Sequence, residues 1–235
     1  MRLHRFYIPE SLPQSSVLVV NYPEHLHQWK KVFRFVPGDT VIIFDGSGVE
    51  CTAQFSYLDT KEARLVLQDR QIPDKEAERE IHMYVAITKK DTFEVIAQKA
   101  TELGVARIIP VISARSEKKD INMLRFKKIV IEATEQSGRT VVPRIYEPIE
   151  FEKIFNGMIA PCIVWEPRGL PFVGQKDAPL SQKVLCMAIG PEGGWTPDEL
   201  ELFQEKGALV RSSGKTVLRT ETAAIAFLSL LILTQ

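Results

Sequence analysis

Cysteine is scarce in this chain of 235 residues, and the three cysteines lie far apart, at Cys51, Cys162 and Cys186. None of them forms part of a CxxC pair. An odd, scattered set argues against a disulfide framework and against a zinc ribbon. We therefore expect no metal site, and we expect the protein to work in a reducing cytoplasm.

Long apolar runs and an excess of charge are also missing. The first residues lack the apolar region of a signal peptide, and the apolar run 223–233 is shorter than the ~20 residues of a membrane span. Thirty basic residues balance thirty acidic ones, so nucleic acid must be contacted by local patches, if at all. The segment 107–144 is one such patch, with nine Lys/Arg against four Asp/Glu. We expect no association with membranes.

Two catalytic motifs are absent and a third is incomplete. The sequence contains neither the GxGxxG fingerprint of dinucleotide-binding folds nor the GxSxG elbow of hydrolases. Gly214-Lys215-Thr216 suggests a phosphate loop, but Leu209 stands where that motif needs its first glycine. A nucleotide hydrolase is therefore disfavoured.

Residue patterns divide the chain into a β-rich part, 1–72, a polar linker, 73–80, and an α/β part, 81–235. The first part is expected to close as a small β-barrel. In the second part, Asp91 and Glu94 predict a capping box, and Thr196 predicts the start of another helix. Expected strands are 40–44, 49–58, 63–67, 81–88, 105–112, 161–165, 184–189 and 208–210; expected helices are 24–35, 91–103, 120–136, 197–206 and one from 220 onward.

The Gly-rich segment Ile189-Gly190-Pro191-Glu192-Gly193-Gly194 follows a predicted strand and precedes a capped helix. Ligands of open α/β sheets bind beyond the carboxyl ends of the strands, where glycine allows close backbone approach. A tight turn with a solvated Glu192 explains the segment equally well. Arg219 stands at a helix start, which is unfavourable for a cation, so we expect a carboxylate partner such as Glu192 or Glu221, or an anionic ligand.

Together with six further segments, these residues resemble the RsmE family of ribosomal RNA methyltransferases, in the SPOUT superfamily. The matching segments run in order along nearly the whole chain: residues 4–7, 37–39, 44–46, 98–105, 108–110, 132–139, 189–194 and 218–223. One difference is Ala133-Thr134-Glu135-Gln136, where the family often has Ala-Ala-Glu-Gln.

The resemblance implies a PUA-like β-barrel that binds RNA, followed by an α/β SPOUT domain with a deep trefoil knot. It also implies a homodimer that binds S-adenosylmethionine and methylates N3 of a specific uridine in small-subunit (16S) ribosomal RNA, assembled or assembling. A SPOUT methyltransferase with another RNA target, and a non-catalytic RNA-binding assembly factor, are the alternatives.

The resemblance places the cofactor on three segments and suggests two catalytic residues, Arg219 to fix the uridine and Glu192 as base or cofactor-orienting group. The cofactor residues would be Trp165, Glu166, Ile189, Gly190, Pro191, Glu192, Gly193, Gly194, Leu218, Arg219, Thr220, Glu221, Thr222 and Ala223. Expected phosphate contacts are Arg2, Arg5, Lys30, Lys31, Arg34, Lys99, Arg115 and Arg139. Phe6, Tyr7 or Trp195 could stack on an everted base. The dimer surface is expected on the last helix, at Ile225, Phe227, Leu228 and Leu231.

Overall fold

The computed structural model describes residues 3–74, 76–158, 161–179 and 181–233. The chain forms two compact units, the first made of residues 1–76 and 134–142, the second of 77–133 and 143–235. The sequence pattern had placed all of 81–235 in the second part, so the return of 134–142 to the first unit is a difference. Only contacts distant in sequence reveal it.

The first unit contains a five-stranded sheet in the order β1-β3-β4-β5-β2. Strand β1 (Arg5–Tyr7) runs parallel to β3 (Thr40–Phe44). The other pairs, which add β4 (Glu50–Leu58), β5 (Ala63–Gln71) and β2 (Val17–Val20), are antiparallel. The β-rich prediction is confirmed. Strands β1 and β2 were missed because three or four residues carry too little alternation to be recognised.

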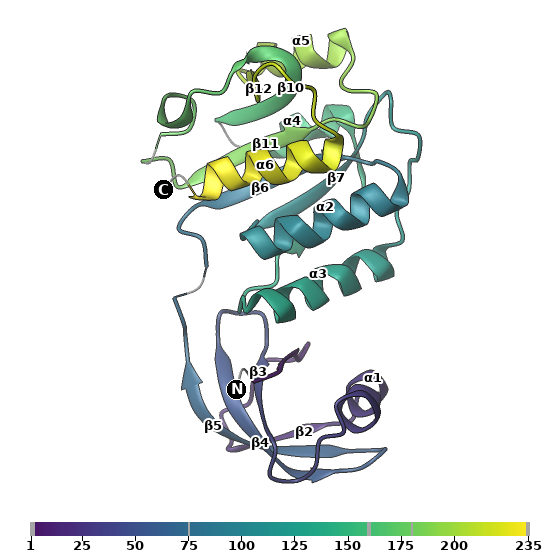
Figure 1. Cartoon of the computed structure of the whole chain (residues 1–235), viewed down its shortest axis with the longest axis vertical. Helices are drawn as coiled ribbons and strands as arrows, with labels where there is room; N and C mark the ends of the chain where they lie inside the picture. Colours follow the sequence, from purple (N-terminus) through teal and green to yellow (C-terminus); the bar gives the residue numbers. More distant parts are fainter. Residues whose placement is uncertain (1–2, 75, 159–160, 180, 234–235) are drawn as a thin grey trace. The chain divides into compact units, whose positions relative to one another are not determined.

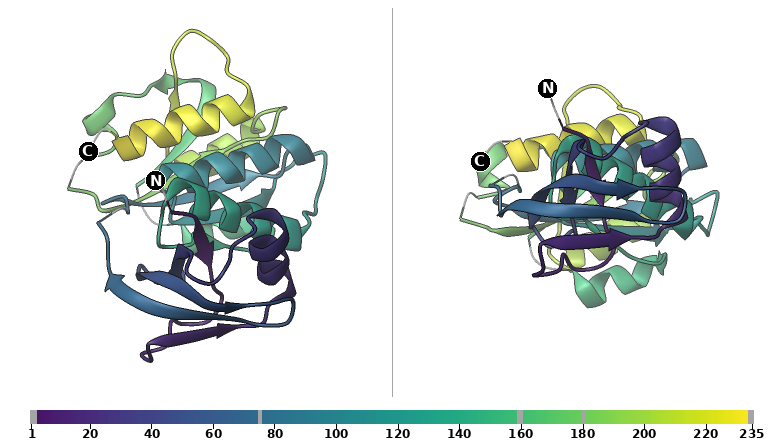
Figure 2. Two further views of the ribbon diagram at one scale, coloured as in Figure 1. Left: turned by 60° about the horizontal axis from the view of Figure 1, so that its bottom comes forward. Right: turned by 90° about the horizontal axis from the view of Figure 1, so that it is seen from below.

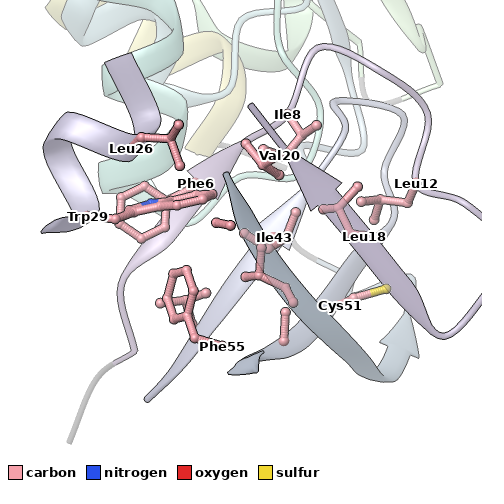
Figure 3. Close-up of a cluster of buried hydrophobic side chains, with 14 residues drawn as sticks. Phe6, Ile8, Leu12, Leu18, Val20, Leu26, Trp29, Ile43, Cys51 and Phe55 are labelled. Atoms are coloured by element: carbon pink, nitrogen blue, oxygen red, sulfur yellow. The ribbon is translucent and has the colours of Figure 1, made fainter. Parts of the chain in front are cut away.

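The core of this unit combines aliphatic side chains with the aromatic rings of Phe6, Trp29 and Phe55 (Figure 3). Helix α1 (Pro23–His27) passes into a π-helical turn, Gln28–Val32, which places Trp29 in the core with no exposed surface. The predicted helix 24–35 therefore ends early. Arg34 has a φ of +57°, which no right-handed helix accepts, and Phe33 and Phe35 on either side both pack against Phe6.

The second unit is built on a parallel sheet in the order β12-β10-β11-β6-β7-β8, with β9 also paired to β7. The strands are β6 (Glu80–Ala86), β7 (Arg107–Ile112), β8 (Arg144–Ile145), β9 (Ile149–Glu150), β10 (Cys162–Pro171), β11 (Val184–Ile189) and β12 (Leu209–Ser212). The α/β prediction is confirmed. Strand β10 extends beyond the predicted residue 165, with an irregularity in its pairing between Trp165 and Leu170.

Helices cover both faces of this sheet (Figure 1). Helices α2 (Lys90–Leu103), α3 (Met123–Ser137) and α6 (Thr220–Leu233) lie on one face. On the other, a 3-10 turn (Phe151–Lys153), α4 (Ile154–Gly157) and α5 (Pro197–Glu205) pack around Tyr84, Ala86 and Trp195; a second 3-10 turn is Gly174–Lys176. The second unit is therefore a parallel sheet with helices packed on both of its faces.

The helix starts show one correct and one wrong capping prediction. Helix α5 has the expected capping box between Thr196 and Glu199. Helix α2 begins at Lys90, and Asp91 does not cap it. The Glu94 carboxylate pairs with Arg125 at 3.0 Å, and Glu192 accepts a hydrogen bond from the backbone N–H of Lys89 at 3.1 Å. The carboxylate of Glu192, and not the predicted capping box, therefore binds a backbone N–H group at the start of this helix.

The polar stretch 73–80, predicted as a plain linker, holds two anchored side chains. Glu76 Oε1 accepts hydrogen bonds from the backbone N–H groups of Thr140 and Val141, both at 3.0 Å. Arg79 is 3% exposed and donates to the carbonyl oxygens of Leu231, at 3.2 Å, and Pro179, at 3.0 Å. Arg79 therefore donates a hydrogen bond to a carbonyl oxygen in the last turn of α6. No later residue of the helix can supply that bond.

Helix α6 is apolar on most of its faces, as the sequence indicated, but most of these residues face the unit's own core. Phe227, Leu228 and Leu231 have no exposed surface, and Ile225 is half-buried. Leu230, not predicted for this role, is 39% exposed. A partner chain could therefore reach only Ile225 of the four residues expected to form a dimer surface. Among the described residues, no helix is long and apolar enough to cross a membrane.

Candidate active site

Three of the predicted site segments emerge from adjacent parallel strands. Trp165 of β10 is in register with Ile189 of β11 and with Arg211 of β12. The carboxyl ends of parallel strands lie at one edge of the sheet, so the irregular part of β10 after Trp165 and the loops after β11 and β12 begin side by side. Figure 2 shows the loop between β12 and α6 arching outward beyond this edge.

The three glycines of the loop after β11 have three different roles. A Cβ on Gly190 would lie 3.2 Å from the indole Nε1 of Trp195, and one on Gly193 would lie 3.3 Å from Cδ of Arg115. Both positions are therefore closed by packing. Gly194 has a φ of +69°, which favours glycine. The family resemblance implies that all three glycines bind the cofactor; among them, Gly194 combines a positive φ with open space.

A buried carboxylate lies beside Gly194. Glu166 is 4% exposed, and its Oε2 lies 3.9 Å from where a Cβ on Gly194 would be. Its Oε1 accepts a hydrogen bond from Nε of the exposed Arg168 at 2.9 Å. The neighbouring Trp165 points into the core, with its ring centroid 4.7 Å from that of Phe227. Glu166 can thus offer a side chain to a ligand, whereas Trp165 can offer only backbone.

Glu192 connects the Gly-rich loop to α2. The side chain is exposed, and its Oε1 accepts the hydrogen bond from Lys89 N–H. Because that bond uses one oxygen, the other remains available to accept a proton or a hydrogen bond. The geometry fits a base as well as it fits an orienting group.

Arg115, predicted to contact RNA phosphate, binds the Gly-rich loop itself. Its Nη1 donates to the carbonyl oxygens of Gly193, at 2.7 Å, and Trp195, at 3.2 Å. The preceding residue, Ala114, donates its N–H to Glu199 Oε1 at 2.9 Å. No residue pattern predicted this arrangement, in which the loop after β7 holds the loop after β11 through Arg115 and the first turn of α5 through Glu199.

The start of α6 presents a cation. Arg219 is exposed, and within the described part of the chain it makes no ion pair, so neither Glu192 nor Glu221 is the carboxylate partner that was expected. Thr222 is exposed, Leu218 and Glu221 are half-buried, and Thr220 and Ala223 are buried. Arg219 therefore remains available to an anionic ligand.

Of the other basic residues that were expected to contact phosphate, some are buried and some are exposed. Arg5 is 8% exposed and pairs with Glu50 at 2.6 Å, and Arg139 is 6% exposed and pairs with Glu76 at 2.7 Å. Neither guanidinium can make the phosphate contact that was expected, because each is already paired with a carboxylate and shielded from solvent. Lys99 pairs with Glu102, Lys30 is half-buried, and Lys31 and Arg34 are exposed. Arg2 lies outside the described residues.

Two of the three aromatic side chains that were suggested to stack on an everted base are not accessible to one. Phe6 is 1% exposed and Trp195 has no exposed surface, because both belong to aromatic cores. Tyr7 is half-buried, and its pKa is raised by burial and by the nearby Asp45. No group of His, Cys, Asp or Glu side chains suited to a metal ion occurs among the described residues.

Comparisons with known proteins identify the family to which the chain is similar. Residues 75–232 match the model of the RNA methyltransferase domain. The ribosomal RNA small subunit methyltransferase E of Rickettsia conorii is 32% identical over 229 residues, which cover 96% of this chain and 93% of that protein.

Two solved structures are also similar along nearly the whole chain. The ribosomal RNA small subunit methyltransferase E of Neisseria gonorrhoeae, bound to S-adenosyl methionine, has a TM-score of 0.87 at 31% identity and covers 97% of this chain and 96% of that one. A methyltransferase of Legionella pneumophila, in complex with the bound cofactor SAM, has a TM-score of 0.90 at 30% identity, covering 98% and 97%. The family match spans more than half of the chain, and the sequence likeness spans nearly all of it. The chain belongs to the RNA methyltransferase family, and within it to the ribosomal RNA small subunit methyltransferase E group.

Proposed function

We propose that this chain transfers a methyl group from S-adenosylmethionine to N3 of a specific uridine in small-subunit (16S) ribosomal RNA. The observation that carries the proposal is the register of Trp165, Ile189 and Arg211, which brings three predicted cofactor segments to one edge of the sheet. The proposal agrees with the names of the relatives and with the cofactor in two similar structures.

The residues at this edge suit the donor molecule. Gly194 leaves open space beside Glu166, whose buried carboxylate can accept hydrogen bonds from ribose hydroxyls or from an ammonium group. Half-buried Leu218 offers an apolar surface for a purine ring, and the backbone of Ile189–Gly194 offers N–H and C=O groups. When bound, S-adenosylmethionine supplies a methyl group carried on a positively charged sulfonium.

The chain's own contribution is to position the uridine and to remove its proton. Arg219, which forms no ion pair with any residue that the structure describes, would hold a phosphate or a carbonyl oxygen of the nucleotide. Glu192 would accept the proton from N3 on the oxygen that does not bind Lys89 N–H, as N3 forms its bond to the methyl carbon. Positioning and a general base together supply large rate effects, the base alone typically ~10²–10⁴-fold.

The remaining architecture follows from the same proposal. The five-stranded sheet of the first unit would be a PUA-like barrel, with Lys30, Lys31 and Arg34 among its phosphate contacts. The second unit would be a SPOUT domain in which the chain from β10 to α6 forms the deep trefoil knot. The protein would act as a cytoplasmic homodimer, with Ile225 and Leu230 of α6 available at the interface.

The decisive test is calorimetric titration of the purified protein with S-adenosylmethionine and, separately, with ATP. We expect the methyl donor to bind and ATP not to bind. Gly194→Val should abolish donor binding, because a β-branched residue is strained at φ +69° and fills the space beside Glu166. The matched control is Gly174→Val, at φ +48° with no atom within 4 Å of its Cβ, which should bind the donor normally.

Incubation with unmethylated small-subunit ribosomal RNA and labelled donor then tests the substrate. Methylation at uridine N3 blocks the pairing edge of the base, so it is mapped as a stop in reverse transcription. Label on another RNA or another atom would favour a SPOUT enzyme with a different target. A folded protein that binds RNA but no donor would favour the assembly factor and contradict the proposal.

A further inference from the structure

A cavity of about 460 Å³ lies in the second unit between the first turn of α2, the loop 118–122 and the start of α3. Its inner wall is apolar and aromatic. Phe93 and Phe126 meet edge to face with ring centroids 5.3 Å apart, and Ile121 and Ile129 extend this wall. The volume lies within the usual range of small-ligand pockets, which is roughly 300–1,000 Å³.

The rim of the cavity carries more cationic than acidic side chains. Lys90, Lys118 and Arg125 line it together with the acids Glu94 and Asp120. The Glu94 carboxylate is neutralised, because it lies 3.0 Å from Arg125 Nη2 and 4.0 Å from Lys90 Nζ. Lys118 is exposed and makes no ion pair within the described part of the chain. One cation at the mouth is therefore available to an anion.

The rim also carries a free hydrogen-bond donor. Asn122 uses its side-chain oxygen to accept a hydrogen bond from the backbone N–H of Arg125 at 2.9 Å. The amide nitrogen of Asn122 keeps its two N–H donors for another group. The apolar wall matches the face of a nucleotide base, and the Asn122 amide matches the polar edge of that base. The cation Lys118 matches the phosphate.

The position of the cavity connects it to the Gly-rich loop. Thr88 and Lys90 line the cavity, and Lys89 between them donates its N–H to Glu192. Thr88 follows β6, the direct neighbour of β11, with Val85 in register with Ile189. The cavity therefore begins two residues along the chain from the end of β6, at the same edge of the sheet as the proposed active site.

We propose that this cavity is a subsite for one unpaired nucleotide of the RNA substrate, which rests on the proposed function. The base lies over half-buried Ile121, with Phe93 and Phe126, 5% and 3% exposed, as the floor of the cavity beneath it; its polar edge meets Asn122, and its phosphate lies at Lys118. Proteins read unpaired RNA in this way, by covering the face of a splayed base and bonding its edge. The subsite holds the RNA strand beside the methyl-transfer site and contributes to binding rather than to chemistry.

The test compares two charge reversals in the second unit, with small-subunit ribosomal RNA as the probe. Lys118→Glu changes the rim of the cavity, and Lys206→Glu makes the same charge change at the exposed end of α5, outside the cavity and outside the basic segment 107–144. We expect Lys118→Glu to raise the Kd for RNA and KM, and to reduce the magnitude of the slope of log K against log salt by about 1 or more. Lys206→Glu should leave all three nearly unchanged.

A second variant tests the interior. Ile121→Trp fills the cavity from a half-buried loop position without removing a charge. It should weaken RNA binding while donor affinity and the melting temperature stay at wild-type values. Wild-type RNA affinity and KM in both Lys118→Glu and Ile121→Trp would overturn the subsite. Absence of donor binding in the unaltered protein would instead contradict the proposed function, so the two failures are distinguishable.

Discussion

The Gly-rich loop shows how single residues of one motif divide between packing and ligand approach. Gly190 makes room for Trp195, Gly193 for Arg115, and Gly194 alone adopts a positive φ beside Glu166. The composition of the segment indicated a site, but it could not separate these roles. They depend on Arg115 and Glu166, which lie 78 and 28 positions away along the chain from Gly193 and Gly194.

Glu192→Gln separates the two functions that the structure allows for this side chain. The amide oxygen can still accept the hydrogen bond from Lys89 N–H, so the loop and its donor affinity should persist. The amide cannot accept the proton of uridine N3, so kcat should fall by roughly 10²–10⁴-fold. Single-turnover methylation and calorimetry measure the two effects. An unchanged kcat would exclude Glu192 as the base and leave it an orienting role.

At the scale of elements, long periodic segments were predictable and short or context-dependent ones were not. Strand β11 occurs where a short continuous apolar run indicated it, and helix α5 occurs where Thr196 and Pro197 did. The start of α2 was wrong because Glu192 satisfies the N–H of Lys89 from a loop about 100 positions later. The predicted linker was incomplete for the same reason, since the partners of Glu76 and Arg79 are distant backbone groups.

The candidate site was predictable as a set of segments and not as a set of contacts. Parallel strands bring their carboxyl ends together, so the convergence after β10 and β11 follows from topology. The clamp made by Arg115 could not be foreseen, because surface arginine carries no signal of its partner. The same holds for the buried Arg5 and Arg139, whose carboxylate partners Glu50 and Glu76 become visible only in the fold.

The first residues of β6 give this strand a pH-dependent contribution to stability. Burial lowers the pKa of His82, but its hydrogen bonds with Cys186 and Glu80 outweigh that effect, and the net shift is upward from 6.5. The hydrogen bond with His82, together with Arg107, holds the pKa of Glu80 below 4.5 against the effect of burial. The stabilisation from His82 is therefore complete below pH 6.5 and lost as pH rises through its folded pKa; that from Glu80 is present above pH 4.5 and lost as pH falls.

Denaturant unfolding of His82→Gln and of the unaltered protein should show this dependence. The stability difference between the two is expected to be largest between the ordinary pKa values of Glu80 and His82, 4.5 and 6.5, and to shrink above the raised pKa of His82. Asp198→Asn, an exposed acidic position on α5, serves as the control and should shift no part of the profile. A difference that is constant between pH 5 and pH 9 would contradict the ion pair.

At the scale of the whole molecule, each unit has a hydrophobic core of its own. Trp29 reports on the first, while Trp165 and Trp195 report on the second. Among the described residues, the partners of the Glu76 carboxylate are Arg139, Thr140 and Val141, which all belong to the first unit. It therefore joins the returning segment 134–142 to the rest of that unit.

Glu76→Ala should lower the unfolding free energy of the first unit by about 1–3 kcal/mol, the usual cost of leaving buried hydrogen-bonding groups unsatisfied. Fluorescence of Trp29, measured in a background where Trp165 and Trp195 are Phe, should show the earlier transition. Fluorescence of Trp165 and Trp195, in a Trp29→Phe background, should change less. Equal shifts for both reporters would mean that the two cores unfold as one cooperative unit.

The strand order of the second unit also has a consequence for synthesis on the ribosome. Strand β6 lies between β7 and β11, and β11 begins about 100 positions after β6 ends. At ~5–20 residues per second, the growing chain carries β6 with one open edge for roughly 5–20 s. An apolar strand with an unpaired edge is a template for aggregation. We therefore expect incomplete chains that end before Val184 to depend on chaperones for solubility, and expression of such truncated chains in a chaperone-depleted extract would measure that dependence.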